Sequence, residues 1–226
     1  MITETPLEKE VAPKIFLVFD TETGGFPSKK KELTDDTQPP TTQLGVSLCT
    51  KDIVIAELSM LLSVGDRYIN PRATEANGHT SELCNEFGLN PLAAITAFHA
   101  MVIKADMVVG HNISFDTQMI DIEYARAGMT EEAKVYNAKP TYCTMKTTTE
   151  LCGLSRKDGR PKYPTLEELY SFLFDVKLEG AHDAMVDVQA TTACFFDPRV
   201  FPFAEMCKVC GAHPAHVDGE CVDCCH

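Results

Sequence analysis

The stretch that decides the fold is KIFLVFDTETGG, which runs from Lys14 to Gly25. Ile15 to Phe19 is a run of apolar residues rich in aromatic and β-branched side chains, which predicts a buried strand. We expect this strand to end at Asp20, with Glu22 pointing the same way two residues later. Two like charges held so close raise each other's pKa unless a cation lies between them. An acid before a glycine turn is also an ordinary strand end, so the rest of the chain has to distinguish the two interpretations.

Length and composition indicate a globular protein. The chain has 226 residues, 44% hydrophobic and 23% charged, enough for one full domain and a small appendage. No apolar run has the length of a membrane span, and the first residues lack a signal-peptide pattern, so we expect a cytoplasmic protein without membrane contact. The net charge of −13 argues against bulk attraction to duplex DNA but permits an enzyme whose acids bind metal ions.

The order of the predicted elements indicates an α/β domain. Pro27 to Thr42 is a polar stretch that predicts a long surface loop. Leu44 to Cys49 and Ile53 to Val64 then predict two strands joined by a short turn. The other predicted elements are a short strand ending at Gly110 and helices beginning at Asn90, at Ser114, at Thr165 and at about Asp183. Strands that come first and then alternate with helices indicate a mixed β-sheet flanked by helices.

Two later segments supply further acids. GHNISFD places Asp116 in the first turn of the helix that follows a strand, and AHDAMVDVQATT supplies His182 and Asp187. Residues five apart on a continuous helix lie about 140° from each other around its axis. His182 can therefore act beside Asp187 only if it precedes the helix, with Asp183 or a neighbour as N-cap.

Four acids near the ends of predicted core elements indicate a metal site. They are Asp20, Glu22, Asp116 and Asp187. Their convergence would be unstable without cations, and oxygen ligands in such number select Mg²⁺ or Mn²⁺. Two such ions about 3.5–4 Å apart clamp the attacking and leaving oxygens of a phosphoryl displacement. A nearby histidine can take the proton from the attacking water.

FDTETGG, GHNISFD and AHDAMVDVQAT together resemble the three motifs of the DEDD-type 3′–5′ exonucleases, in the subgroup whose third motif is His-x-x-x-x-Asp. The family includes proofreading exonuclease subunits of DNA polymerases, ribonuclease T and oligoribonuclease, and implies a ribonuclease H-like fold. By this resemblance, Asp20, Glu22 and Asp187 would bind the first metal ion, and Asp20 would help bind the second. Asp116 would reach a metal ion through water, and His182 would be the general base.

Other residues near the motifs carry weaker signals. By resemblance, the backbone at Thr23 and Gly24 would contact the terminal nucleotide, where a small residue permits close approach. We expect His111 to orient a loop and Phe115 to pack in the core. His79 stands where the family carries a His-Gly-Ile-Thr element, but the order here is NGHT.

A basic segment, MKTTTELCGLSRKDGRPKYP, interrupts this acidic sequence. Two interpretations stay open for its cations, which are Lys146, Arg156, Lys157, Arg160 and Lys162. They form either a solvated loop or a phosphate track with Tyr163 as a stacking partner for a base.

The C-terminal residues carry a second metal pattern. FFDPRVFPF contains two prolines that break the last helix, so we predict an exonuclease-like domain over residues 1–200 and a tail over 201–226. The tail resembles a zinc ribbon, in which two Cys-x₂-Cys pairs close one structural Zn²⁺ site. The expected ligands are Cys207, Cys210, Cys221 and Cys224, and the alternative ligands are His213, His216, Cys225 and His226. We expect the five cysteines elsewhere in the chain to be reduced.

The sequence thus predicts a metal-dependent 3′–5′ exonuclease that releases nucleoside monophosphates from single-stranded DNA or RNA, with DNA favoured and a proofreading or repair role. One alternative is an exoribonuclease of the ribonuclease T or oligoribonuclease type. Another is a non-catalytic, zinc-containing adaptor on a nuclease-like scaffold. Proofreading would require a separate polymerase, to which the zinc tail could bind. Sugar preference depends on contacts to the 2′-OH, which no motif fixes.

Overall fold

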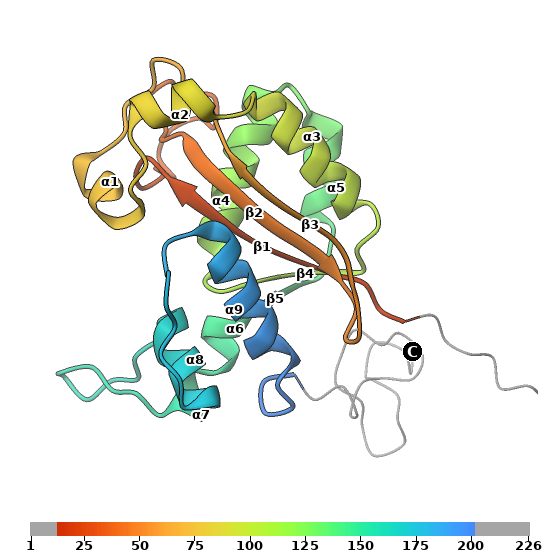
Figure 1. The fold of residues 1–226 in the computed structure, drawn as a ribbon, viewed down its shortest axis with the longest axis vertical. Coiled ribbons are helices and arrows are strands. Elements are labelled where there is room, and N and C mark those ends of the chain that lie inside the picture. Colours follow the sequence, from red (N-terminus) through yellow and green to blue (C-terminus); the bar gives the residue numbers. More distant parts are fainter. Residues whose placement is uncertain (1–12, 202–226) are drawn as a thin grey trace, which may run out of the picture.

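The computed structural model of the chain describes residues 13–201. Its fold is built on a mixed β-sheet. Its five strands lie in the order β3-β2-β1-β4-β5 (Figure 1). β1 pairs antiparallel with β2 and parallel with β4, and therefore lies at the centre of the sheet. The strands are β1 (Phe16–Thr23), β2 (Thr41–Cys49), β3 (Val54–Leu61), β4 (Met107–Gly110) and β5 (Thr141–Cys143). The predicted α/β class with a mixed sheet is confirmed.

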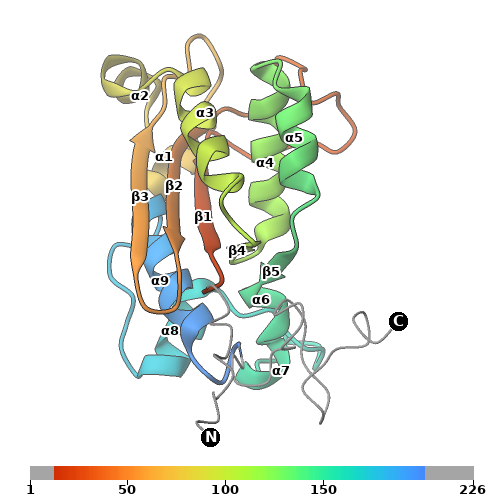
Figure 2. The same ribbon diagram turned by 90° about the vertical axis from the view of Figure 1, so that its right-hand side faces the viewer.

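Helices cover both faces of this sheet (Figure 2). One face carries α3 (Pro91–Val102), α4 (Ile113–Arg126) and α5 (Thr130–Asn137). The other carries α9 (Ala184–Phe196), with α8 (Leu166–Phe174) packed against it. The shorter helices are α1 (Pro71–Asn77), α2 (Ser81–Phe87), α6 (Thr144–Thr147) and α7 (Thr149–Cys152).

The side chains of β1 alternate between two buried clusters. Leu17 and Phe19 pack with residues of α3 and α4, whereas Phe16 and Val18 pack with residues of α9. The ring centroids of Phe16 and Phe195 lie 5.0 Å apart. Even-numbered residues of β1 therefore face α9 and odd-numbered residues face α4.

This alternation continues beyond the apolar part of β1. The strand was expected to end at Asp20, but it runs to Thr23, because Asp20 and Glu22 still pair with Gly45 and Gln43 of β2. For the same reason β2 begins at Thr41 rather than at Leu44. Asp20 and Glu22 thus extend the face that packs on α9, and Thr21 extends the face that packs on α4.

Local sequence signals correctly predicted where the helices α3 and α8 begin. Asn90 caps α3 by accepting from the Leu92 N–H, and Thr165 and Glu168 form the expected capping box of α8. Predicted β3 was too long, since the strand ends at Leu61. The short elements α1, α2, α5, α6, α7 and β5 were not predicted.

Within residues 13–201 the cysteines are free thiols, as expected. No helix in this range is both long and apolar enough to cross a membrane. The predicted zinc tail, from Cys207 to Cys224, falls outside the described residues, and the domain boundary near residue 200 stays a prediction.

Candidate active site

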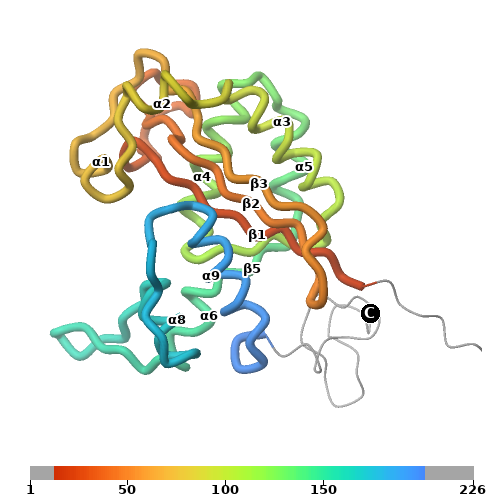
Figure 3. The backbone as a smooth tube through the Cα atoms, viewed as in Figure 1, coloured from red at the N-terminus to blue at the C-terminus, as the bar shows by residue number. Residues whose placement is uncertain are grey.

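The four predicted acids line one cavity of about 490 Å³. Asp20 and Glu22 come from β1, Asp116 from α4 and Asp187 from α9. His182, in the loop before α9, lines the same cavity. Figure 3 follows the backbone to the C-terminal end of β1, which lies near α1 and the beginning of α9. The structure therefore brings together all five residues to which the motifs assigned catalysis.

A glycine lets the first turn of α9 approach the sheet. A Cβ at Gly45, opposite Asp20, would lie 2.5 Å from the Ala184 carbonyl oxygen, closer than any side chain permits. The Gln43 side chain on the same strand accepts a hydrogen bond from the Ala184 N–H at 3.1 Å. These contacts fix the beginning of α9 and so bring Asp187, in its first turn, beside the acids of β1.

Thr21 holds Asp116 from the opposite face of β1. Its backbone N–H and its hydroxyl both donate to Oδ1 of Asp116, at 3.0 and 2.7 Å. Asp116 is almost fully buried, and hydrogen bonds of this kind fix the orientation of a carboxylate. The residue between Asp20 and Glu22 therefore links β1 to the second motif.

His182 precedes α9, as its partnership with Asp187 requires. Asp183 caps the helix by accepting from the N–H groups of Met185 and Val186. His182 has a left-handed backbone, with φ of 70°, and its N–H donates to Oδ2 of Asp187 at 3.2 Å. Ligand atoms of Glu22, His182 and Asp187 lie within 4.8 Å of one another.

The cavity concentrates negative charge. Burial and then repulsion from Asp116, Asp187 and Glu22 raise the pKa of Asp20 well above its usual value. Burial also raises the pKa of Glu22 and of Asp116 to about 7 each, although hydrogen bonds from Asn77 and Thr21 oppose it. An adjacent cation would reverse these shifts by favouring the charged form.

The donor set fits divalent metal ions. Oδ1 of Asp187 is buried and has no hydrogen-bond partner among residues 13–201, although buried carboxylate oxygens normally have one. The converging donors are carboxylate oxygens with one imidazole nitrogen, a combination that suits Mg²⁺ or Mn²⁺ better than a soft metal. The repulsion among the acids is the kind that a bound cation removes.

A model of the exonuclease family RNase_T matches residues 17–195. The chain belongs to this exonuclease family. The match confirms the resemblance to the DEDD-type exonucleases and identifies an enzyme, a metal-dependent nuclease. No curated protein matches the sequence.

Solved structures of E. coli exonuclease I share the fold of this exonuclease. The complex with a dA16 oligonucleotide has a TM-score of 0.66 and 21% identity, over 84% of this chain and 42% of that chain. The zinc-bound complex with single-stranded DNA has a TM-score of 0.65 and 22% identity, over 84% and 42%. The chain thus spans less than half the length of these proteins. The likeness confirms the ribonuclease H-like fold.

Sequence reasoning missed Asn77 of the exonuclease, which orients one of the acids. Its Nδ2 donates to Oε2 of Glu22 at 3.1 Å and to the Thr23 carbonyl oxygen at 3.2 Å. Asn70 and Pro71 begin α1 with the same cap and first-turn proline that predicted α3, so the helix could have been found. Its contact with Glu22 had no sequence signal.

The predictions for the residues near the motifs that carried weaker signals were only partly correct. Phe115 was expected in the core but lines the cavity, where its ring meets that of Phe26 edge-on at 6.0 Å. His111 joins loops as expected, since its ring nitrogens bond the Thr144 hydroxyl and the Pro164 carbonyl oxygen. His79 is buried against the Thr42 hydroxyl at 2.9 Å and does not line the cavity.

The expected substrate contact at Thr23 and Gly24 stays a prediction. Thr23 lines the cavity. The Gly24 N–H donates to the Pro40 carbonyl oxygen at 2.8 Å, and its own carbonyl oxygen accepts from Asn70 at 2.7 Å. Both backbone groups of Gly24 are therefore engaged within the chain.

The basic segment is only partly available to a ligand. Arg160 forms an ion pair with Asp158 at 2.7 Å, and Lys162 forms one with Glu168. This pairing favours the solvated loop for these two cations.

Proposed function

We propose that this exonuclease releases nucleoside monophosphates from the 3′ ends of single-stranded nucleic acid, with DNA preferred. The observation that carries the proposal is the convergence, in one cavity, of four carboxylates from three different elements. The cavity of about 490 Å³ has the size of a small-ligand site. The preference for DNA is supported by the similar exonuclease I, whose solved structures contain single-stranded DNA.

The residues divide into metal ligands, a base and supports. Asp20, Glu22 and Asp187 would hold one of two Mg²⁺ or Mn²⁺ ions, and Asp20 and Asp116 would serve the other. When bound, the ions supply Lewis-acid stabilisation of the phosphoryl oxygens. His182 accepts the proton of the attacking water while its N–H bond to Asp187 fixes the loop.

Hydrolysis by this arrangement consumes one water molecule. The water oxygen bonds to the terminal phosphorus, and the bond from phosphorus to the 3′ oxygen of the preceding nucleotide breaks. The products are a nucleoside 5′-monophosphate and a strand one nucleotide shorter with a free 3′-hydroxyl group. Thr21 keeps Asp116 in place during this reaction.

Some finer expectations have no further support. The structural Zn²⁺ site at Cys207, Cys210, Cys221 and Cys224 lies outside the described residues. Neither the fold nor the comparisons support a polymerase partner for it. Cytoplasmic location likewise stays a prediction. Membership of the exonuclease family favours the enzyme over a non-catalytic adaptor.

The test uses 5′-labelled single-stranded DNA and RNA of equal sequence. We expect a ladder that shortens from the 3′ end in Mg²⁺ and disappears in EDTA. Asp20→Asn should lower the rate at least about 10²- to 10³-fold, the loss typical of removing one preorganised electrostatic group. Asp52→Asn, at an exposed acid in the β2–β3 turn, is the matched control.

Intact substrates in Mg²⁺ and in Mn²⁺ alike would contradict the proposal, as would an Asp20→Asn variant of normal activity. Faster cleavage of RNA would instead select the exoribonuclease alternative, since the chemistry is the same and only contacts to the sugar differ.

A further inference from the structure

A second cavity, of about 330 Å³, opens on the first turns of α4. The wall opposite α4 is formed mainly by residues 28–32, which have the sequence SKKKE and which we call the lysine loop. The lysine and hydroxyl side chains in the walls of this lysine cavity are Ser28, Lys29, Lys31, Ser114 and Thr117. None of them has a role in the proposed hydrolysis, so the reaction at the carboxylates does not explain the cavity.

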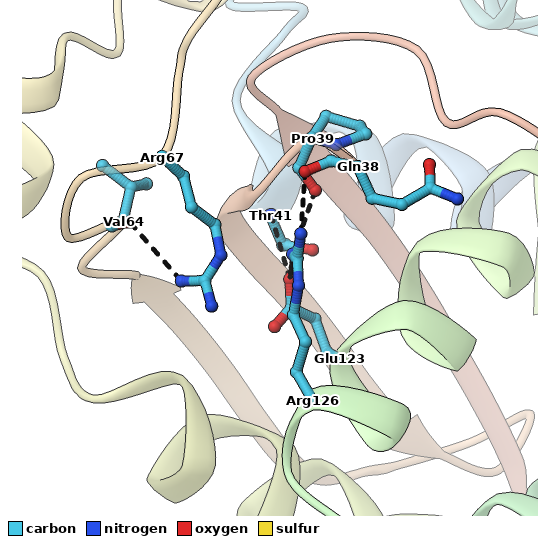
Figure 4. A network of polar contacts seen from close by, with 7 residues as sticks. All are labelled: Gln38, Pro39, Thr41, Val64, Arg67, Glu123 and Arg126. Carbon is cyan, nitrogen blue, oxygen red and sulfur yellow. Dashed lines mark hydrogen bonds and ion pairs between the residues drawn. The ribbon is translucent and has the colours of Figure 1, made fainter. Parts of the chain in front are cut away.

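A buried glutamine fixes the conformation of the lysine loop. The Gln38 side chain is only 2% exposed. Its Oε1 accepts from the Ser28 N–H at 2.9 Å, and its Nε2 donates to the carbonyl oxygens of Ser28 and Glu32 at 2.9 and 3.3 Å. The Gln38 carbonyl oxygen in turn accepts from the Arg126 guanidinium at 2.7 Å (Figure 4). Because a satisfied buried network rigidifies the segments that it joins, the lysine loop is preformed.

A pair of aromatic rings lies between the lysine cavity and the carboxylates. Phe26 and Phe115 both line the carboxylate cavity, and their rings meet edge-on at 6.0 Å. Ser28, two residues after Phe26, and Ser114, directly before Phe115, line the lysine cavity instead. The two cavities therefore adjoin at this ring contact. A strand that leaves the carboxylates across these rings reaches the lysine loop next.

The charges and donors of the lysine cavity suit a phosphate group. The net charge of −13 repels a polyanion, so cations close to the site are needed to hold one. Lys29 is exposed, and its ammonium has no ion pair and no hydrogen bond within residues 13–201. Lys31 donates to the Thr37 hydroxyl and keeps two further donors. The acid in the wall, Asp121, already accepts from Asn137. Lysine and hydroxyl groups are the usual donors to phosphate oxygens of nucleic acid.

We propose that the lysine cavity binds a backbone phosphate group of the single strand on the 5′ side of the scissile bond, with Lys29 as its ionic contact. The proposal rests on the proposed function, because only a strand whose last phosphodiester lies at the carboxylates carries its preceding phosphates past Phe26 and Phe115. The hydroxyl groups of Ser28 and Ser114 donate to the same phosphate. Because the contact is to the backbone, it is independent of base sequence.

The test compares a natural single strand with one of the same sequence in which every phosphodiester except the 3′-terminal one is an uncharged methylphosphonate. We expect the wild-type kcat/KM for the first cleavage to be higher for the natural strand. Lys29→Gln should lower this ratio about 2- to 5-fold, the value of one exposed ionic contact, and Lys29→Arg should keep it. Lys104→Gln is the matched control, since Lys104 is also exposed and lines neither cavity.

The dependence of the rate on salt gives a second readout. Each phosphate contact of a single strand contributes about 0.7 to the slope of log affinity against log salt. Lys29→Gln should therefore reduce the slope of log kcat/KM for the natural strand by about 0.7 and leave the slope for the uncharged strand unchanged. Lys104→Gln should change neither slope.

The ratio separates the phosphate site from folding and from the reaction itself. A loss of folded protein lowers both rates equally, so it cannot change the ratio. A wild-type ratio of one, or a wild-type ratio in Lys29→Gln, overturns the phosphate site while the proposed function stands. If the wild type cleaves only the natural strand, affinities from fluorescence anisotropy replace the rates. If it cleaves neither strand, the proposed function fails. The same affinities then decide the phosphate site, and equal values for the two strands overturn it.

Discussion

Helix α4 carries buried charge at both ends, in two different arrangements. Near its C-terminal end, Glu123 and Arg126 form an ion pair whose side chains are only 9% and 10% exposed. At its beginning, Asp116 joins three other acids, and burial raises its pKa to about 7. Opposite charges bonded within the chain maintain the fold, whereas like charges that raise each other's pKa indicate a site for a cation.

The two arrangements also differ in how they are satisfied. The Arg126 guanidinium donates to the carbonyl oxygens of Gln38 and Pro39, and Glu123 accepts a backbone N–H of β2, so both charges have partners (Figure 4). Among the acids, Oδ1 of Asp187 is buried and has no partner within the described chain. The repulsion between charges and the unpaired oxygen thus lie at the end of α4 that faces the cavity.

The largest expected effect on stability comes from breaking the satisfied pair. Arg126→Met leaves Glu123 buried without its counter-charge and removes the donor to the Gln38 and Pro39 carbonyl groups, so we expect the free energy of unfolding to fall by about 3–5 kcal/mol. Urea unfolding monitored by circular dichroism measures this loss. Arg160→Met is the control, because its partner Asp158 is exposed and a surface pair contributes little.

A loss below about 1 kcal/mol in Arg126→Met would contradict this prediction, because a loss of that size is expected when a surface ion pair is broken. The double variant Arg126→Met/Glu123→Met tests whether the unpaired Glu123 carboxylate causes the loss. Replacing both charges removes the unpaired carboxylate, so the double variant should be more stable than the single one.

The second prediction concerns pH at the other end of α4. The pKa of Glu22 rises from 4.5 to about 7 on folding, and that of Asp116 from 3.8 to about 7. Between about pH 4.5 and 7 the folded state therefore binds more protons than the unfolded state, and stability falls as the pH rises. In EDTA we expect a loss on the order of 3 kcal/mol from pH 5 to pH 8.

Mg²⁺ should reduce this loss, because a bound cation favours the ionised carboxylates. Thermal unfolding at several pH values, with EDTA and with Mg²⁺, measures both slopes. Equal slopes with and without Mg²⁺ would show that the acids do not share a metal ion. The acids at the beginning of α4 would then not form the metal site that distinguishes this end of the helix from its C-terminal end.

The features that the sequence predicted correctly depend on residues that are close together in the chain. The N-cap at Asp183 and the strand at Phe16 depend on neighbouring residues, and both were visible as local patterns. β1 was predicted too short because its apolar run ends at Phe19. Asp20 and Glu22 stay in the strand through pairing with β2, which the run of apolar residues does not record.

The convergence of the acids was predicted from their places near the ends of core elements and from the resemblance, but the contacts that produce it were not predicted. Thr21 and Asp116 are 95 residues apart, and parallel pairing of β1 with β4 is what brings them together. The contact of Arg126 with the Gln38 carbonyl oxygen joins residues 88 apart, and no motif predicted it. Contacts of this kind depend on tertiary packing, so single-residue patterns cannot find them.

The smallest expected effect concerns Asn77, which supports Glu22 from the last residue of α1. Its hydrogen bond lowers the pKa of Glu22 against the effect of burial. In Asn77→Ala the Glu22 carboxylate loses this donor, takes up a proton more readily and binds metal less well. We expect the Mg²⁺ concentration for half-maximal activity to rise about 10-fold, as for other residues that orient a metal ligand.

Asn137→Ala is the matched control for this variant. Asn137 is also the last residue of its helix, α5, and its Nδ2 donates to Oδ1 of Asp121 at 2.8 Å, outside the carboxylate cavity. Both variants lose one bond from an amide to a carboxylate, but only Asn77→Ala should change the Mg²⁺ dependence. If Asn77→Ala loses stability and keeps the wild-type Mg²⁺ titration, its contact maintains the fold. Asn77 would then resemble the ion pair at the other end of α4 rather than the acids beside it.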